Sequence, residues 1–243
     1  PKVRPRARTG RRTRAGPPPG ASGDAVMVRL AIFDCDGTLS DGQAEVCEAM
    51  EQTFEACGLP PPDRHAIRRT VGLSLPVAIE RLAPEEDPEL HAFAVSQYKH
   101  FYMQARQQGR VVEPLFAGVA DLVARLHTKG WTLGVATGKS DRGLNATLAM
   151  HGLAQYFTTL QTADRHPSKP HPSMIEAALA DTGALPAATA MIGDTAFDIE
   201  MARVAGVRPI GVAWGYHTVT ELLAAGATDV ARSPEELEAM LDG

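Results

Sequence analysis

Asp34 and Asp36 are the residues of this sequence whose type and spacing point most directly to chemistry. They follow a short apolar run rich in β-forming residues, Val28–Phe33, and the Asp36-Gly37 pair is typical of a turn. In a strand, residues i and i+2 point to the same side, so both carboxylates are expected on one face. Two carboxylates inside a core would be very costly, so we expect the strand to end there with the pair facing a site. The alternative is a plain turn that terminates the strand.

Three further polar segments follow later in the chain. Taken alone, each has an ordinary interpretation: Thr137-Gly138 as a turn and Lys169-Pro170 as a solvated loop. Asp194 and Asp198 could be the cap and the first-turn acid of a helix. Parallel strands, however, bring their carboxyl ends to one edge of a sheet, where ligands bind. Residues far apart along the chain are therefore expected to meet at one site.

The elements that must position these residues alternate between strand and helix. Short apolar runs predicted to be strands are Val28–Phe33, Trp131–Ala136, Phe157–Leu160, Thr189–Ile192 and Val207–Val212. Helical patterns separate the later runs, at Val119–His127, Arg142–Met150, Met174–Ala180 and Ala196–Ala205. Such alternation implies right-handed parallel βαβ units. The predicted fold class is therefore α/β, a doubly wound parallel sheet (Rossmann-like) with an inserted α-helical cap domain.

Residues 43–110 interrupt the alternation because their pattern is helical throughout. The helical segments are Glu45–Cys57, Asp63–Thr70, Leu75–Leu82 and Pro88–Gln108, with Pro and Gly residues between them. A stretch without a strand cannot extend the sheet. We therefore predict a helical cap over 43–110, inserted into an α/β catalytic core formed by 27–42 and 111–243.

The segment 1–26 differs from the rest of the chain in composition. It carries seven Lys and Arg residues, one acidic residue, five Pro and four Gly, with almost no large apolar side chain. Such a segment cannot bury enough surface to offset the entropy lost on ordering, so it is predicted to be a disordered basic tail. A nucleic-acid arm, a transit peptide and a dispensable extension are the alternatives for its role. The body that follows is strongly acidic, which disfavours nucleic acid as a partner.

The composition excludes several classes of protein. The chain has 243 residues, 44% of them hydrophobic, and a formal net charge of −5. This length is enough for a full-sized core. No apolar run is long enough for a transmembrane helix, so no membrane partner is expected. Three cysteines argue against a disulfide framework and favour a reducing compartment, the cytoplasm. The sequence leaves the oligomeric state open.

In order and together, the motifs resemble those of the haloacid dehalogenase-like phosphatase superfamily, from about Val28 to the end of the chain. The matching segments are Asp34-Cys35-Asp36-Gly37-Thr38-Leu39, Val135-Ala136-Thr137-Gly138-Lys139, Lys169-Pro170-His171-Pro172 and Ile192-Gly193-Asp194-Thr195-Ala196-Phe197-Asp198. The resemblance implies that Asp34 attacks phosphorus and that Asp36 is the general acid and base. It thereby implies two steps, formation of an aspartyl-phosphate and its hydrolysis by water.

The same resemblance implies Mg²⁺ as the cofactor. A phosphomonoester carries close to two negative charges, so a carboxylate nucleophile is repelled unless cations neutralise both groups. The implied ligands are the side chain of Asp34, the main-chain carbonyl of Asp36 and the carboxylate of Asp194. Asp198 would orient this set without binding the metal itself.

The remaining motif residues are implied to hold the phosphate. Lys169 would place a positive charge beside Asp34 and the phosphate, while the Thr137 hydroxyl and the backbone at Gly138 would bind phosphoryl oxygens. An acid at the position of Asp36 also distinguishes phosphatases from dehalogenases of the superfamily, because the dehalogenases do not use an acid there. The residue set therefore points to phosphate-ester or phosphate-transfer chemistry.

The helical insert resembles the small α-helical cap of the phosphoglycolate phosphatase and β-phosphoglucomutase branch. Such caps exclude bulky macromolecules, so the resemblance implies a phosphatase for a small phosphorylated metabolite, with phosphoglycolate as the first candidate. Alternatives of the same fold are an inorganic pyrophosphatase, a sugar-phosphate phosphatase and a β-phosphoglucomutase. A non-catalytic binding or regulatory protein is an alternative of another class, against which the complete motif set argues.

Three residues of the insert, Arg68, Arg69 and Ser74, lie where relatives contact substrate. An arginine pair would suit an anionic leaving group, whereas the plain alternative is a solvated helix face. The sequence departs from the usual family pattern at Gly42, where Ser is common, and at Gly138, where Asn is common. Neither departure removes a charge or a nucleophile.

Overall fold

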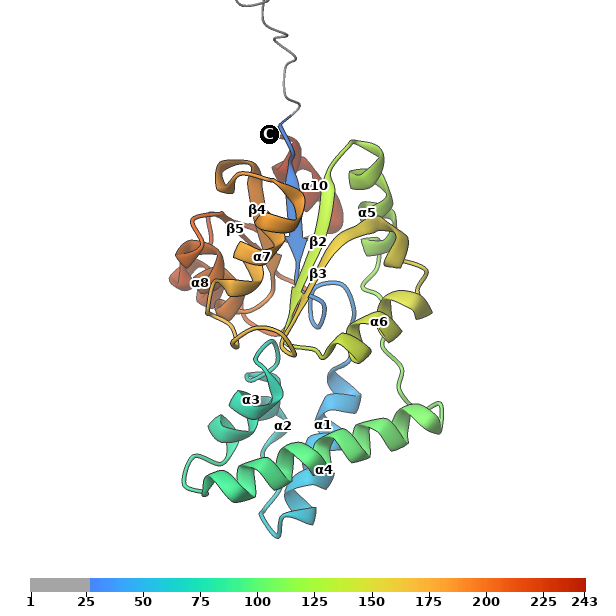
Figure 1. Cartoon of the computed structure of the whole chain (residues 1–243), viewed down its shortest axis with the longest axis vertical. Helices are drawn as coiled ribbons and strands as arrows, with labels where there is room; N and C mark the ends of the chain where they lie inside the picture. The colour runs from blue at the N-terminus through green and yellow to red at the C-terminus, as the bar shows by residue number, and fades with distance from the viewer. Residues whose placement is uncertain (1–26) are drawn as a thin grey trace, which may run out of the picture.

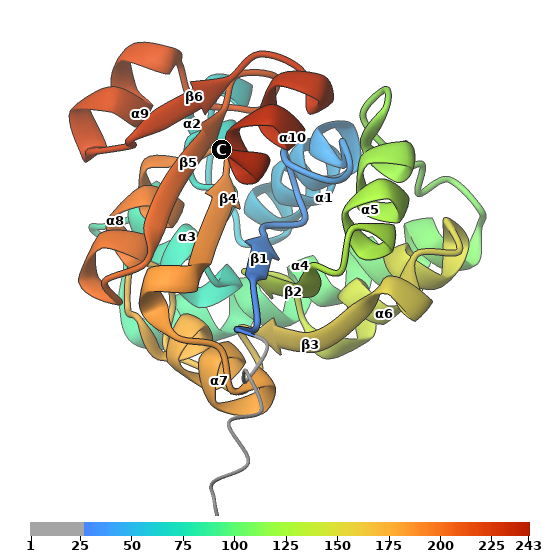
Figure 2. The ribbon, with the colours of Figure 1, turned by 90° about the horizontal axis from the view of Figure 1, so that it is seen from above.

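The structure is a computed structural model that describes residues 27–243, so the tail expected over 1–26 lies outside the described residues. Six strands form one parallel sheet in the order β3-β2-β1-β4-β5-β6 (Figure 1, Figure 2). They are β1 (Leu30–Phe33), β2 (Thr132–Thr137), β3 (Phe157–Thr162), β4 (Thr189–Gly193), β5 (Arg208–Val212) and β6 (Asp229–Ala231). The predicted doubly wound parallel sheet is confirmed, and β6 adds a strand that the sequence pattern did not predict.

The central strand β1 is buried on both of its faces. Ala31 and Phe33 pack into the hydrophobic cluster on one side of the sheet, and Leu30 and Ile32 pack into the cluster on the other side. A strand covered by helices on both sides needs apolar residues at every position. This explains why the first motif is preceded by an unbroken apolar run.

Helices cover both faces of the sheet, as the view from above shows (Figure 2). α5, α6 and α10 pack on the side of Phe33, whereas α7 and α8 pack on the side of Ile32, with α9 beside α8. These helices are α5 (Val119–Thr128), α6 (Asp141–Met150), α7 (Ser173–Thr182), α8 (Ala196–Val204), α9 (Val219–Ala225) and α10 (Pro234–Asp242). Two short 3₁₀ helices span Ala154–Tyr156 and Pro186–Ala188.

Four helices between β1 and α5 form a cap beyond one end of the sheet, drawn from blue to green in Figure 1. They are α1 (Gln43–Ala56), α2 (Arg64–Arg68), α3 (Leu75–Leu82) and α4 (Pro88–Gln107). All four contribute to a hydrophobic core that is separate from the two clusters of the sheet. α2 ends at Arg68 rather than at the expected Thr70, and a turn through Gly72, with φ +96°, leads into α3.

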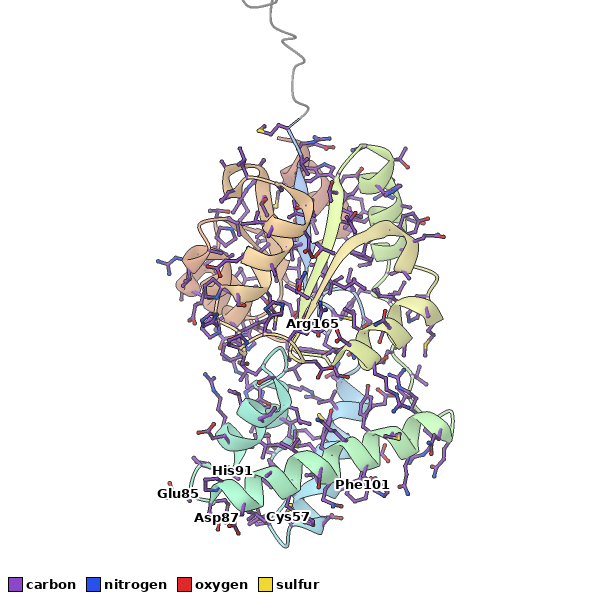
Figure 3. All side chains as sticks on the ribbon, in the orientation of Figure 1. Cys57, Glu85, Asp87, His91, Phe101 and Arg165 are labelled. Atoms are coloured by element: carbon purple, nitrogen blue, oxygen red, sulfur yellow. The ribbon has the colours of Figure 1, made fainter. Side chains whose placement is uncertain are left out.

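Side chains of the core and of the cap project into the space between them (Figure 3). Arg165 lies at the end of the core that faces the cap, while Asp87 and His91 mark the end of the cap that lies away from the core (Figure 3). Over residues 27–243, no helix is both long and apolar enough to cross a membrane.

Candidate active site

The carboxyl ends of the three central strands, β2, β1 and β4, point toward the cap. Asp34 directly follows β1, Thr137 ends β2, and Asp194 directly follows β4. β1 pairs in parallel register with both neighbours, and the Asp34 amide donates a hydrogen bond of 2.9 Å to the Ile192 carbonyl. The topology thus brings the first, second and fourth motifs to one edge of the sheet.

Three fully buried carboxylates, those of Asp34, Asp194 and Asp198, form the centre of this site. Each offers one oxygen, and the three oxygens all lie within 4.8 Å of one another. Lys169, from the loop after β3, is buried as well, and its Nζ lies 2.9 Å from Asp34 Oδ1 and 2.6 Å from Asp198 Oδ1. The structure therefore brings together four of the residues that the sequence singled out.

The electrostatics of the cluster favour a divalent cation. Burial raises the pKa of Asp34 to about 7, with Lys169 opposing the shift and Asp198 adding to it. Burial also raises the pKa of Asp194 well above its usual range, and Asp198 and Asp34 raise it further. Three carboxylates facing one ammonium group leave two negative charges uncompensated when all are ionised. Hard carboxylate oxygens are the donors that Mg²⁺ prefers, so the donor set fits this ion.

The two oxygens of Asp34 have different environments. Oδ1 accepts hydrogen bonds from the Cys35 amide at 2.6 Å and from Lys169 Nζ at 2.9 Å. Oδ2 is buried and has no hydrogen-bond partner among the described residues. A methyl group on Gly72 of the cap would come within 3.8 Å of Oδ2. The free oxygen therefore faces the space that the cap covers, where a ligand or a reacting group would sit.

Asp198 and Asp194 are held by different contacts. Asp198 Oδ2 accepts from the amide and hydroxyl of Thr195, at 3.0 and 2.7 Å, while Oδ1 accepts from Lys169 at 2.6 Å. With both oxygens engaged, Asp198 is placed to orient Lys169 and the start of α8. Asp194 accepts from the Thr38 hydroxyl and the Tyr216 amide, both at 2.9 Å.

Glycine is required beside Asp194, which leads to a test of this packing. A Cβ on Gly215 would collide with the side chain of Asp194, which is fully buried. Gly215→Ala is therefore expected to lower the free energy of unfolding by about 1–3 kcal/mol, measured by thermal or denaturant unfolding. Gly143→Ala is the control, since the nearest atom to its Cβ would be Ser140 Oγ at 3.3 Å, so a much smaller loss of stability is expected. Unchanged stability of Gly215→Ala would contradict the close approach to Asp194.

Asp36 lies outside the carboxylate cluster. Its Oδ1 lies 2.9 Å from Lys139 Nζ, which in turn donates to Glu113 Oε1 at 2.7 Å. Burial raises the pKa of Asp36, and Lys139 opposes the shift. Burial would also raise the pKa of Glu113, but Lys139 and the hydrogen bonds that Glu113 accepts lower it to about 2. The two aspartates of the first motif thus have different cationic partners.

The second motif lies directly under the cap. Thr137 is buried, and its hydroxyl accepts a hydrogen bond of 3.2 Å from the Lys139 amide. A Cβ on Gly138 would collide with the backbone carbonyls of Gly72 and Leu73. Glycine at 138 therefore allows the cap backbone to approach the sheet edge closely.

Two of the three cap residues singled out by sequence join the cap to the core. Arg69 pairs with Glu221 of α9 at 2.6 Å, and the Ser74 amide donates to Ser168 Oγ at 2.9 Å, one residue before Lys169. Arg68 lines an open cavity of about 430 Å³ together with Asp41, and Asp34 is not among its lining residues. That these three residues contact substrate stays a prediction.

Sequence reasoning gave no role to Lys139 and did not single out Glu113. Lys139 lies in the second motif, but its position two residues after Thr137 does not predict a contact with Asp36. Glu113 is a lone acid in the linker between α4 and α5, and nothing in the local pattern marks it.

Comparison with known proteins agrees with this geometry. A model of the haloacid dehalogenase-like hydrolase family matches residues 31–212. A protein named "Probable phosphatase IndB", of Dickeya dadantii (strain 3937), is 42% identical over 205 residues, covering 82% of this chain and 87% of that protein. A phosphoglycolate phosphatase of Vibrio vulnificus (strain CMCP6) is 30% identical over 218 residues, covering 86% of this chain and 94% of that protein. A solved haloacid dehalogenase-like family hydrolase of Streptococcus pneumoniae matches with a TM-score of 0.76 at 26% identity, covering 88% of this chain and 98% of that structure.

The matched range includes all four motifs, from Asp34 after β1 to Asp198 in the first turn of α8. Sequence similarity, sheet topology and the position of the cap all agree. The chain belongs to the haloacid dehalogenase-like hydrolase family, and the Dickeya dadantii and Vibrio vulnificus relatives are named as phosphatases.

Proposed function

We propose that the protein is a Mg²⁺-dependent phosphatase that hydrolyses a small phosphomonoester through an aspartyl-phosphate, with phosphoglycolate as the first candidate. The observation that carries the proposal is the asymmetry of Asp34. One of its oxygens is fixed by Lys169 and the Cys35 amide, and the other is buried with no hydrogen-bond partner among residues 27–243. Such an arrangement suits a carboxylate nucleophile, because one oxygen is anchored and the other is free to attack.

In the first step, Asp34 Oδ2 attacks phosphorus in line with the leaving oxygen, and the bond from phosphorus to that oxygen breaks. Lys169 holds the nucleophile in place and offsets its negative charge. Asp36 gives a proton to the departing alkoxide. In the second step, Asp36 takes a proton from the water that attacks the aspartyl-phosphate, and Asp34 and inorganic phosphate are released.

Mg²⁺, bound by the Asp34 and Asp194 carboxylates and the Asp36 main-chain carbonyl, would neutralise charge on the phosphate and on the nucleophile. The excess of negative charge in the buried cluster supports this assignment. Asp198 would orient this set, because its Oδ1 holds Lys169 and its Oδ2 holds Thr195 at the start of α8.

The closeness of the cap supports a small substrate. Gly138 lies against the Gly72 and Leu73 backbone, and Arg69 bridges to Glu221, so the cap covers the carboxyl ends of the strands. A phosphorylated macromolecule would have to displace these contacts. The phosphatase names of the relatives agree with a phosphate ester, and that of the Vibrio vulnificus protein suggests phosphoglycolate.

A panel of small phosphate compounds tests the proposal, with phosphoglycolate, pyrophosphate, sugar phosphates and p-nitrophenyl phosphate as members. We expect turnover of small monoesters in Mg²⁺, no turnover after EDTA treatment, and recovery on adding Mg²⁺ back. Release of phosphate from none of these compounds in Mg²⁺ would contradict the proposal. A clear preference for pyrophosphate would mean that the substrate is a phosphoanhydride and not phosphoglycolate.

Ca²⁺ is expected to inhibit at fixed Mg²⁺ and to support no turnover alone. Ca²⁺ accepts six to eight oxygen ligands and tolerates bidentate carboxylates, whereas Mg²⁺ demands near-octahedral geometry and takes few protein ligands. Ca²⁺ can therefore capture the Asp34 oxygen that must stay free to attack. The measurement is a Ca²⁺ titration, repeated with Ca²⁺ as the sole divalent ion. Full activity in Ca²⁺ alone would contradict the attack by Asp34.

A further inference from the structure

A chain of buried charged contacts runs from the cap through the linker to Asp36. Its centre is the Glu113 carboxylate, whose side chain is fully buried and stands between α4 of the cap and α5 of the core. From the cap, the Tyr102 hydroxyl donates to Oε1 at 2.7 Å and Arg106 lies 3.3 Å from Oε2. From the core, Lys139 donates to Oε1 and Thr147 to Oε2, both at 2.7 Å.

Stability of the fold alone does not require a buried carboxylate with this many hydrogen-bond donors. Removing a carboxylate from water is costly, and a well-packed apolar residue would often serve stability equally well. Glu113 accepts hydrogen bonds from α4, from α6 and from the loop after β2, so one carboxylate joins three segments. The segment between β1 and α1 also packs against Glu113, since a Cβ on Gly42 would lie 3.5 Å from Glu113 Cγ and 3.3 Å from Asp36 Oδ1.

The consequence of the arrangement lies at Lys139. A lysine ammonium group sits on a flexible four-carbon stem, so one carboxylate alone fixes it poorly. Here Nζ is held between Glu113 Oε1 at 2.7 Å and Asp36 Oδ1 at 2.9 Å. Lys139 contacts Oδ1 of Asp36, which leaves Oδ2 as the oxygen to carry the proton toward a leaving group.

We propose that Glu113 is a positioning residue for Asp36, acting through Lys139, and that the hydrogen bond from Tyr102 couples this placement to the orientation of the cap. The inference rests on the proposed function, in which Asp36 is the general acid. When the cap is in the orientation described here, Tyr102, Glu113 and Lys139 line up and Asp36 is held. When the cap moves, Glu113 loses its contacts from α4 and Lys139 is less firmly fixed.

The test is a double-mutant cycle of Glu113→Gln and Lys139→Met, measured with two esters. Phosphoglycolate has an alkoxide leaving group that needs a proton, whereas p-nitrophenolate leaves without one. We expect Glu113→Gln to lower kcat/KM about tenfold for phosphoglycolate and less than about threefold for p-nitrophenyl phosphate. The tenfold loss is smaller than the usual contribution of a general acid, because Asp36 itself is still present. The double variant should be no slower than Lys139→Met alone, because Glu113 acts through Lys139.

Glu48→Gln is the matched control. Glu48 pairs at 2.8 Å with Arg110, which lies in the same linker as Glu113, between α4 and α5. Its side chain is half exposed, and Glu48→Gln removes the same charge as Glu113→Gln. It should leave the ratio of the two kcat/KM values unchanged. Losses that multiply in the double variant, or equal losses for both esters, would overturn the positioning role. If the wild-type protein hydrolyses none of the phosphate compounds of the panel above, the proposed function itself fails, and this inference fails with it.

Tyr102→Phe tests the coupling to the cap and does not depend on the folding of Glu113→Gln. It removes one hydrogen bond and leaves all charges in place. We expect the same selective loss for phosphoglycolate, smaller than that of Glu113→Gln, and no further loss in the Lys139→Met background. Circular dichroism and thermal unfolding check that each variant is folded. An unchanged ester ratio in Tyr102→Phe would overturn the coupling to the cap.

Discussion

Replacing Asp34 by asparagine should abolish turnover of every small phosphate ester, by about 10⁴-fold or more, while the protein stays folded. The substitution is nearly isosteric, but an amide oxygen is a far weaker nucleophile than a carboxylate. It also removes the oxygen that has no partner in the structure and that the proposed mechanism uses for attack. The loss should be seen equally with good and poor leaving groups, because the attack itself is lost.

Stability should respond differently from activity. Asp34 is crowded by Asp198 and Asp194, and burial raises its pKa to about 7, so removing its charge relieves repulsion in the metal-free protein. We expect a Tm within a few degrees of wild type, and a smaller rise in Tm on adding Mg²⁺, since ligands that bind the folded state stabilise it. Asp229→Asn, at an exposed pair with Arg208, is the control and should keep full activity. An Asp34→Asn rate within tenfold of wild type would contradict the nucleophile assignment.

Much of the fold could be predicted because local signals agree with the topology. β1 and β4 are continuous apolar runs followed by turn residues, which is what a strand covered on both faces requires. β6 escaped prediction because Asp229–Ala231 is too short to show any period and begins with an acid. It is a strand because β5 offers it an edge for pairing. Such a tertiary effect leaves no local pattern.

The residues of the candidate site also fall into two groups, those that the sequence could place and those that it could not. Asp34, Thr137 and Asp194 stand at strand ends, so the parallel topology alone brings them to one edge, and their roles stay predictions. Glu113 has no such signal, because its partners come from α4, α6 and the loop after β2. Arg69 likewise meets Glu221 only through packing of the cap on the core.

The two aspartates of the first motif are separated by their surroundings. Asp34 shares Lys169 with Asp198, inside a cluster whose excess charge suits a cation. Asp36 shares Lys139 with Glu113, away from that cluster. Paired carboxylates in different environments can take different roles, one staying ionised and the other cycling a proton. This difference in surroundings supports the proposal that Asp34 attacks phosphorus and that Asp36 transfers the proton.

Replacing Asp36 by asparagine is therefore expected to separate the two kinds of ester. For phosphoglycolate, kcat/KM should fall by about 10²–10⁴-fold, the usual contribution of a general acid. For p-nitrophenyl phosphate it should fall by about tenfold or less, because p-nitrophenolate departs without a proton. Asparagine keeps the size of the side chain and the main-chain carbonyl, so the fold and the proposed Mg²⁺ ligand are retained. The measurement is steady-state kinetics of both esters with wild type and variant.

The second step gives an independent readout of the same substitution. Asp36 is also proposed to take the proton from water when the aspartyl-phosphate is hydrolysed, so the variant should form this intermediate from p-nitrophenyl phosphate and then release it slowly. Rapid mixing should show a burst of about one p-nitrophenolate per active site, followed by slow turnover. Phosphoglycolate should give no burst, because its first step is already slow. Equal falls in kcat/KM for the two esters, with no burst from the aryl ester, would mean that Asp36 does not move the proton and that another group protonates the leaving oxygen.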